Sequence, residues 1–150
     1  MATLRAFNHI LLYTDGCSKG NPGPGAVGVL VCDDSNRLLY EYSECIGHCT
    51  NNEAEYRALI KGLDLVARYT RRRVTAFSDS ELVVRQMNGV YRLKKDHLRN
   101  LYQEVRDRER VFNSVTYQHV LRGNQRMTEA DRLNKQAFTG RPVNRCHVDT

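Results

Sequence analysis

Four carboxylates stand far apart in this sequence, at points where ordinary folding has little use for an acid. They are Asp15, Glu55, Asp79 and Asp131. The first follows an apolar run, the second opens a helical pattern, the third closes the strand-like stretch VTAFSD, and the fourth lies in EADRL near the C-terminus. Because Mg²⁺ prefers oxygen ligands and commonly binds a few carboxylates, the set predicts a metal site.

Each of these acids, taken alone, has an ordinary explanation as a turn residue, a helix cap or a first-turn acid that suits the helix dipole. Four acids placed to converge on one edge of a sheet make that explanation weaker. Clustered carboxylates also repel one another, which raises some of their pKa values. Two divalent cations about 3.5–4 Å apart would relieve the repulsion, and such a pair positions a water nucleophile and stabilises a leaving oxygen.

Helical geometry separates Glu55 from its neighbour Glu53. The run TNNE matches a capping box in which Thr50 is the cap and Glu53 reaches back. The apolar residues that follow recur at helical spacing: Ala58, Leu59, Gly62, Leu63 and Val66. Glu55 shares their face, whereas Glu53 shares a face with Arg57 and Lys61. We therefore expect Glu55 to point toward the sheet, where a buried carboxylate needs a partner.

The coarse pattern predicts an α/β fold with strands near residues 9–14, 26–32, 38–46, 74–78 and 114–120. Helices are expected after Thr50 and over residues 80–87, 96–112 and 128–138, followed by a loose tail over residues 140–150. The order indicates one mixed sheet, an antiparallel meander joined to parallel strands by helical crossovers. Asp15 and Asp79 then fall at strand ends, where ligands gather in such sheets.

Length and composition agree with one globular domain over residues 1–150, with its core at about residues 9–138. The chain is 41% hydrophobic and 27% charged, and its net charge of +6 suits an anionic partner. No apolar run is long enough for a membrane span and no signal-peptide pattern is present, so a cytoplasmic protein is expected. The five cysteines are odd in number and include no CxxC, so reduced thiols are favoured over a zinc site at Cys45 and Cys49.

Four motifs in this order resemble ribonuclease H type 1: YTDGCSKGNPGPGAVG, TNNEAEYRALIKGL, FSDSELVVRQMNG and EADRL. The resemblance covers about residues 9–138. It implies the ribonuclease H-like fold, a five-stranded mixed sheet flanked by helices. It also implies an endonuclease that cuts the RNA strand of RNA/DNA hybrids, leaving 5′-phosphate and 3′-hydroxyl ends. A monomer without an obligatory protein partner is expected.

By the same resemblance, the four carboxylates are both the catalytic residues and the metal ligands. Asp15 would bridge two Mg²⁺ ions, with Mn²⁺ as a substitute. Glu55 and Asp79 would complete one site and Asp131 the other. Residues that match substrate-contacting positions of the family are Asn21, Thr50, Asn51, Asn52, Ser80 and Glu81. The asparagines offer both donor and acceptor to a 2′-hydroxyl, although turn and cap chemistry would also explain them.

The loop before Asp131 departs from the family pattern. Many members carry a histidine there, but His119 of this chain falls within the expected strand. The resemblance to archaeal-like members offers three candidates for product release: Arg122, Asn124 and Arg126. Met127 also stands where the family often has asparagine.

The chain also resembles the short form of the family, which lacks a tryptophan-bearing basic protrusion. The basic residues that could still contact DNA phosphates are Arg85, Arg92, Lys94, Lys95 and Arg99, although a solvated basic face is the plain alternative.

Two other functions remain open at this stage. One is a module that binds hybrids without cutting them, against which the four intact carboxylates argue. The other is a nuclease that acts on DNA, since DNA-cutting relatives share the fold. The asparagines after Thr50 and the NPGPG turn favour RNA. A substrate panel of hybrid, RNA duplex and DNA duplex separates the three functions.

Overall fold

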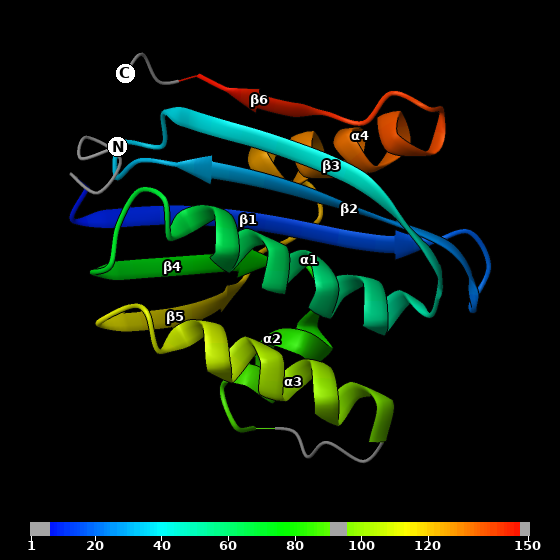
Figure 1. The fold of residues 1–150 in the computed structure, drawn as a ribbon, viewed down its shortest axis with the longest axis horizontal. Helices are drawn as coiled ribbons and strands as arrows, with labels where there is room; N and C mark the ends of the chain where they lie inside the picture. The colour runs from blue at the N-terminus through cyan, green and yellow to red at the C-terminus, as the bar shows by residue number, and fades with distance from the viewer. Residues whose placement is uncertain (1–6, 91–95, 148–150) are drawn as a thin grey trace.

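The computed structural model describes residues 7–90 and 96–147 and shows one six-stranded sheet flanked by four helices (Figure 1). The strands are β1 (His9–Ser18), β2 (Gly23–Cys32), β3 (Leu38–Cys49), β4 (Arg73–Ser78), β5 (Ser114–His119) and β6 (Asn144–Cys146). The helices are α1 (Asn51–Val66), α2 (Glu81–Met87), α3 (Asp96–Glu109) and α4 (Gln125–Phe138). The mixed α/β fold expected from the sequence is confirmed.

The strand order is β5-β4-β1-β2-β3-β6, so β1 is internal to the sheet. β1 pairs antiparallel with β2 and parallel with β4, and β4 pairs parallel with β5. The expected meander of β1, β2 and β3 followed by parallel strands is therefore present. Each parallel connection carries at least one helix, as a crossover between parallel strands requires.

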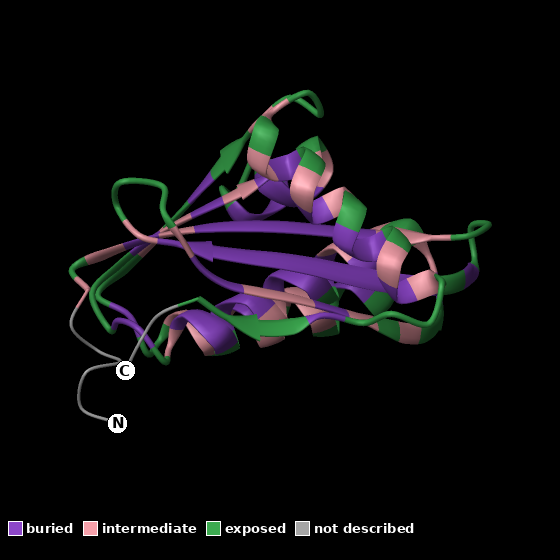
Figure 2. Ribbon diagram, turned by 90° about the horizontal axis from the view of Figure 1, so that it is seen from above, coloured by how far each residue is buried: buried purple, intermediate pink, exposed green. Residues whose placement is uncertain are grey.

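The helices form two layers on opposite faces of the sheet (Figure 1). Ile10 and Leu12 of β1 pack into the larger core under α1, α2 and α3, whereas Tyr13 packs into the smaller core under α4. This division follows from the strand period of two, which sends successive side chains to opposite faces. In Figure 2 the central strands and the inward helix surfaces are buried and the outer helix surfaces are exposed.

Helix α1 begins with the capping box that the sequence predicts. The Thr50 hydroxyl oxygen accepts from the Glu53 amide at 3.1 Å, and the Thr50 amide donates to the Glu53 carboxylate at 2.7 Å. Two of the otherwise unpaired amides at the helix start are satisfied in this way. The start of α1, and with it the position of Glu55, is thus fixed by local interactions.

The first hairpin is longer than the sequence predicts. β1 continues to Ser18 and β2 starts at Gly23, because the ladder extends to the pair Ser18 and Gly25. β3 likewise continues to Cys49. The glycines and prolines of this segment indicated a turn, but Gly23 and Gly25 pair with β3. Asp15 consequently lies inside a strand, opposite Gly28, and not at a strand end.

The C-terminal segment is not a loose tail over its described part, and this expectation was wrong. Val143 is buried, its amide donates to the Ser43 hydroxyl at 3.0 Å, and its carbonyl accepts from the Ser43 amide at 2.7 Å. Residues 144–146 then pair with β3 as β6, which makes six strands where five were expected. All three side chains of β6 are exposed, so no apolar pattern marked this strand in the sequence.

Smaller differences affect the helix and strand ends. α4 starts at Gln125, one turn earlier than expected, because Asn124 caps it by accepting from the amides of Arg126 and Met127. Asp131 therefore lies about two turns into the helix. α3 ends at Glu109 and β5 at His119, each earlier than predicted. Among the described helices, none has the length and apolar character needed to cross a membrane.

Candidate metal centre and nucleic-acid interface

The candidate site lies beside β1 at the point where β4 ends. The last β1–β4 pair joins Tyr13 to Phe77, and Asp15 stands two residues beyond it. Past that pair the edge of β1 is no longer covered by β4, so side chains from both faces of the sheet can meet there. Asp79 directly follows β4 and reaches the same point. The rule that ligands gather at strand ends thus applies to β4 and not to β1.

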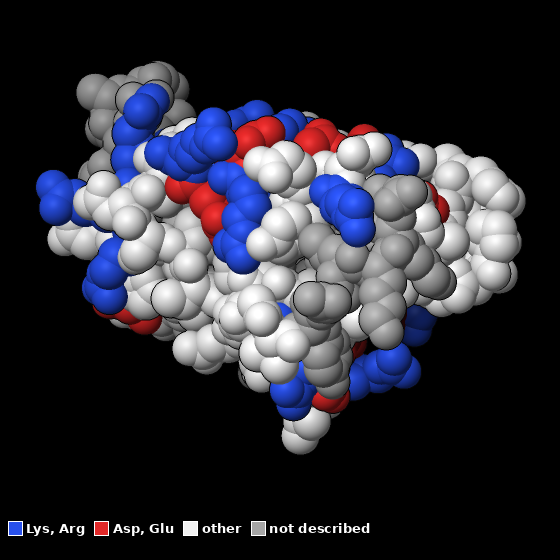
Figure 3. Space-filling model, turned by 90° about the horizontal axis from the view of Figure 1, so that it is seen from below, with Lys and Arg blue, Asp and Glu red and all other residues white. Residues whose placement is uncertain are grey.

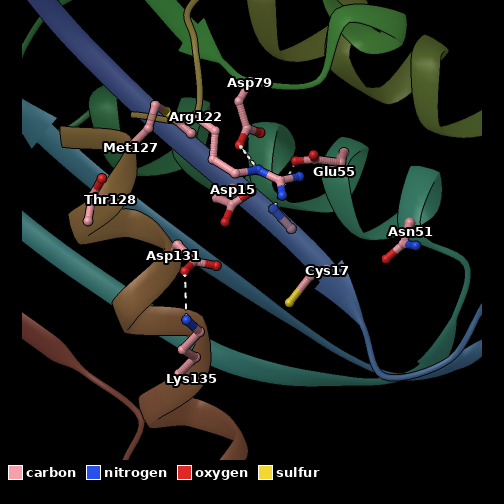
Figure 4. A pocket seen from close by; sticks show the side chains of 11 residues that line it. Asp15, Cys17, Asn51, Glu55, Asp79, Arg122, Met127, Thr128, Asp131 and Lys135 are labelled. Atoms are coloured by element: carbon pink, nitrogen blue, oxygen red, sulfur yellow. Dashed lines mark hydrogen bonds and ion pairs between the residues drawn. The ribbon is translucent and has the colours of Figure 1, made fainter. Parts of the chain in front are cut away.

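Three of the four predicted carboxylates form a tight cluster. Oxygen atoms of Asp15, Glu55 and Asp79 all lie within 4.8 Å of one another. Asp15 is buried, and the other two are half-buried. They arrive from β1, from the second turn of α1 and from the end of β4, as Figure 4 shows.

Asp131 lies on α4 and lines the same pocket without joining the tight cluster. Its carboxylate pairs with Lys135 one turn further along, at 3.1 Å. The pocket has a volume of about 690 Å³. Its lining residues are Asp15, Gly16, Cys17, Asn51, Glu55, Asp79, Arg122, Met127, Thr128, Asp131 and Lys135. The structure therefore brings all four predicted acids to one pocket.

Two glycines, Gly16 in β1 and Gly28 in β2, let a helix approach the sheet closely on each face near Asp15. A Cβ atom on Gly16 would lie 2.1 Å from the Ala54 carbonyl oxygen of α1. A Cβ atom on Gly28, the register partner of Asp15, would lie 2.3 Å from the Ala130 carbonyl oxygen of α4. Only glycine permits backbones to approach this closely. Helix α1 thus lies against β1 itself, and α4 lies against β2 at the residue opposite Asp15.

Two hydrogen bonds hold carboxylates of the cluster. The Gly16 amide donates to Glu55 Oε1 at 2.9 Å, which uses the close approach of β1 to α1. The side-chain amide of Asn134 on α4 donates from Nδ2 to Asp15 Oδ2 at 3.0 Å. Each of the two most enclosed acids of the cluster is thus oriented by a neighbouring donor.

Burial and mutual repulsion make the cluster hold protons more tightly than ordinary carboxylates. Burial, followed by the charges of Asp79 and Asp131, raises the pKa of Asp15 from 3.8 to about 7. Burial and then the charge of Asp15 also raise the pKa of Glu55 well above its usual value, although the Gly16 amide opposes this. Burial and the nearby carboxylates raise the pKa of the Cys17 thiol to about 11, which keeps it protonated at neutral pH. A divalent cation would relieve this repulsion.

The donor set fits a hard divalent cation. Hard ions such as Mg²⁺ and Mn²⁺ favour carboxylate oxygens and retain several waters, which an open pocket of this size accommodates. Within residues 7–90 and 96–147, one cationic side chain pairs with the mutually repelling carboxylates of the cluster. Arg122 Nε lies 3.8 Å from Asp79 Oδ2, but its side chain is 95% exposed. In Figure 4 this side chain extends across the pocket between Asp79 and Asp15.

The predicted substrate residues divide into a group at or next to the pocket and a group that lies away from it. Asn51 lines the pocket, and its side-chain oxygen accepts from the Ser18 amide at 2.9 Å. The Asn21 side-chain oxygen in turn accepts from the Asn51 amide at 3.0 Å. Thr50 lies next to this network as the cap of α1. Asn51 therefore lies at the pocket rim, and Asn21 and Thr50 are its immediate neighbours.

The other predicted substrate residues, Asn52, Ser80 and Glu81, do not line the pocket. Asn52 is half-buried in the first turn of α1. Ser80 caps α2 by accepting from the Val83 amide, and Glu81 pairs with Arg85 at 2.8 Å.

Of the three candidates for product release, only Arg122 lines the pocket. Asn124 is occupied as the cap of α4. Arg126 donates to the Asn36 carbonyl at 2.6 Å and pairs with Glu129 at 2.7 Å, which ties the start of α4 to the loop between β2 and β3. His119 lies at the end of β5, where its ring contacts the Asp79 carbonyl at 3.3 Å and does not line the pocket.

The expected basic surface is described only in part. Arg92, Lys94 and Lys95 lie outside the described residues. Arg99 is exposed on α3. Figure 3 shows the molecule from the side of β5, α2 and α3, where basic and acidic side chains lie side by side along one border. This mixture agrees with the ion pairs that α3 makes through Arg106 and Arg108.

Sequence reasoning missed Asn134 and Gly28. Asn134 is fully buried and donates to Asp15, and Gly28 gives α4 its close approach. A signal for Asn134 exists in the sequence, because it is a polar residue in the otherwise apolar stripe of Met127, Ala130 and Ala137 on α4. Gly28 carries no such signal, since it stands in a strand among residues that are equally compatible with burial.

Structural and sequence similarity agree with the geometry. Ribonuclease H1 from the archaeon Halobacterium salinarum superposes with a TM-score of 0.83 at 32% identity, covering 88% of this chain and 98% of that one. LC11-RNase H1, solved in complex with an RNA/DNA hybrid, gives a TM-score of 0.82 at 34% identity over 87% and 97% of the two chains. The fold and the carboxylate cluster together define a protein of the ribonuclease H-like class.

The sequence comparisons narrow this class. A family model described as reverse transcriptase-like matches residues 13–137. Ribonuclease H of Rhodopirellula baltica is 34% identical over 152 residues, covering 90% of this chain and 92% of the relative. The chain belongs to the ribonuclease H family, type 1. The bifunctional protein Rv2228c of Mycobacterium tuberculosis is 39% identical over 130 residues, and the match spans only 35% of that protein's length.

Proposed function

We propose that this protein is an endoribonuclease that cuts the RNA strand of RNA/DNA hybrids with the help of two divalent metal ions. The observation that carries the proposal is the convergence of Asp15, Glu55 and Asp79 within 4.8 Å, with Asp131 in the same pocket. The family membership and the relative solved with a hybrid support the substrate. We also propose that residues 1–150 form a single domain with its core at about residues 9–138, since strands from both halves of the chain share one sheet.

In this proposal the four acids divide between two metal positions. Asp15 contributes to both, Glu55 and Asp79 complete one, and Asp131 belongs to the other, in keeping with its place outside the tight cluster. When bound, such a pair of metal ions would position a water nucleophile and stabilise the leaving oxygen. Hydrolysis of this kind would leave 5′-phosphate and 3′-hydroxyl ends. The carboxylates would hold the metal ions in place and balance their positive charge, and none of them attacks the substrate. Mg²⁺ is the expected ion, with Mn²⁺ as a substitute.

The pocket rim is the proposed contact for the hybrid. Asn21 and Asn51 present amide groups next to the pocket, and amides can both donate to and accept from a 2′-hydroxyl. Their hydrogen bonds to the backbone and to each other hold them in place before substrate arrives. Arg122 is exposed and lies over the pocket, so we assign it the contact with a departing phosphate.

A substrate panel tests this function. The protein is incubated with labelled RNA/DNA hybrid, RNA duplex and DNA duplex in Mg²⁺ or Mn²⁺, and the product ends are identified. We expect cleavage of the RNA strand of the hybrid alone. Binding of the hybrid without cleavage in either metal would instead identify a binding module, and cleavage of the DNA duplex would identify a DNA nuclease.

Glu55 and Glu53 form a matched pair for assigning the acids. Glu55→Gln removes a carboxylate of the cluster, so cleavage should fall by at least about a thousandfold. Glu53→Gln alters the capping box outside the pocket, so it should reduce stability slightly and keep cleavage near the wild-type rate. Equal activities of the two variants would contradict the assignment of Glu55.

A further inference from the structure

Asn134 combines two features that are unusual for a buried residue. Its side chain is completely buried on the inward face of α4. Its Nδ2 donates to Asp15 Oδ2 at 3.0 Å, and the carboxylate dictates this orientation because it would repel the amide oxygen. A polar side chain from α4 is therefore in direct contact with the acid that lies at the centre of the cluster.

The other end of the Asn134 amide has no partner. Oδ1 is the one buried side-chain nitrogen or oxygen atom without a hydrogen bond in residues 7–90 and 96–147. It lies beside Gly28, where a Cβ atom would approach it to 3.0 Å. Leaving a buried acceptor unsatisfied costs free energy, and an apolar residue of the same shape would avoid this cost. The unsatisfied oxygen therefore offsets part of the stability that the bond to Asp15 supplies, so the gain in stability from asparagine at this position is small.

The contact with Asp15 has a second effect, on the orientation of the acid. A carboxylate turns easily about the bond to its Cβ, so one that is held only at its backbone presents its oxygens in many orientations. The bond from Asn134 restrains Oδ2 and thereby fixes the plane of the carboxylate. In other metal sites, donors to ligating carboxylates act in this way and tune the affinity of the site.

We propose that Asn134 is a positioning residue that orients Asp15 for divalent cation binding. The proposal rests on the proposed function only through the role of Asp15 as a metal ligand. Asn134 itself touches neither cation nor substrate. It reaches Asp15 because Gly28, opposite Asp15 in β2, lets α4 lie against the sheet.

The test compares Asn134→Leu with the wild-type protein. Leucine has the same number of side-chain heavy atoms and removes both the donor and the unsatisfied acceptor. We expect Mn²⁺ affinity, measured by calorimetry without substrate, to fall by about tenfold. The Tm without metal should change little, because leucine removes the unsatisfied acceptor together with the donor to Asp15. The increase in Tm that Mn²⁺ produces should shrink. The control is Gln136→Leu, on the same helix outside the pocket, which should bind Mn²⁺ as the wild type does.

Cleavage assays add a second measurement. In Asn134→Leu the Mn²⁺ concentration for half-maximal cleavage should rise by about tenfold. The decrease in kcat at saturating Mn²⁺ should be smaller than this factor. A merely structural role would lower kcat at every metal concentration and lower the Tm.

Wild-type Mn²⁺ affinity in folded Asn134→Leu would overturn the proposal. If leucine does not fit, Asn134→Ala removes the same hydrogen bond and needs no extra room, and the same affinity criterion applies to it. Because calorimetry needs no substrate, the outcome does not depend on hybrid cleavage. A wild-type protein that binds Mn²⁺ but cuts no hybrid would refute the proposed function and leave this inference intact.

Discussion

Replacing Asp15 by asparagine should abolish cleavage and, at the same time, stabilise the metal-free protein. The reason is the position of the acid, which is 6% exposed and faces the other carboxylates of the cluster. Burial and the charges of Asp79 and Asp131 raise its pKa from 3.8 to about 7. Asparagine has nearly the same shape and carries no charge, so it removes the repulsion and leaves the packing in place.

The size and sign of the effect follow from proton linkage. Between pH 4 and pH 7 the folded protein keeps the Asp15 proton and the unfolded chain releases it, so stability falls as the pH rises through this window. A pKa that moves from 3.8 to about 7 corresponds to about 4 kcal/mol above pH 7, at about 1.36 kcal/mol per tenfold change in proton affinity. Because coupled carboxylates share their protons, we expect Asp15→Asn to raise the free energy of unfolding by about 2–4 kcal/mol at pH 8.

The assay is urea unfolding in the presence of a chelator at pH 4.5, 6 and 8. The stability difference between Asp15→Asn and wild type should be small at pH 4.5 and reach its full value at pH 8. Asp107→Asn, on the exposed side of α3, is the control and should change stability by less than about 0.5 kcal/mol at every pH. A variant that is no more stable than wild type at pH 8, or a difference that does not vary with pH, would refute the reasoning.

Three further predictions follow from the same geometry. Gly28→Ala should destabilise the protein by at least about 2 kcal/mol and lower the cleavage rate, because the added methyl group would meet the Ala130 carbonyl of α4. Thermal unfolding and a cleavage assay measure the two effects. Thr50→Ala should lower the free energy of unfolding by about 1 kcal/mol, measured by chemical unfolding, since it removes the acceptor for the Glu53 amide. Wild-type stability would contradict the capping role of Thr50. Mn²⁺ affinity should be about tenfold weaker at pH 6 than at pH 8, because protons compete with the ion for Asp15. Calorimetry at both pH values measures this, and equal affinities would contradict the prediction.

Local signals allowed much of the fold to be predicted. The capping box at Thr50, the apolar face of α1 and the order of strands and helices depend on interactions between residues close in sequence, which periodicity reports directly. The same phase argument selected Glu55 over Glu53, and the structure places the Glu55 carboxylate in the cluster.

The sequence-based predictions were wrong where contacts between residues far apart in the chain decide the structure. The glycines and prolines after Ser18 predict a turn, yet Gly23 and Gly25 pair with β3 across the sheet. β6 has only exposed side chains, so its pairing depends on β3 and on the Ser43 contact to Val143. Neither feature leaves a periodic pattern in the sequence, because backbone hydrogen bonds between strands do not depend on side-chain type.

Motifs and periodicity are enough to identify the family, the four acids and the elements that carry them. How these acids come together depends on the tertiary structure. The pairing of β1 with β4 stops two residues before Asp15, two glycines bring α1 against β1 and α4 against β2, and Asn134 reaches Asp15 from α4. Distances of this kind arise from the packing of layers far apart in the chain. For that reason Asn134 became visible as a neighbour of Asp15 only after the sheet and α4 were assembled.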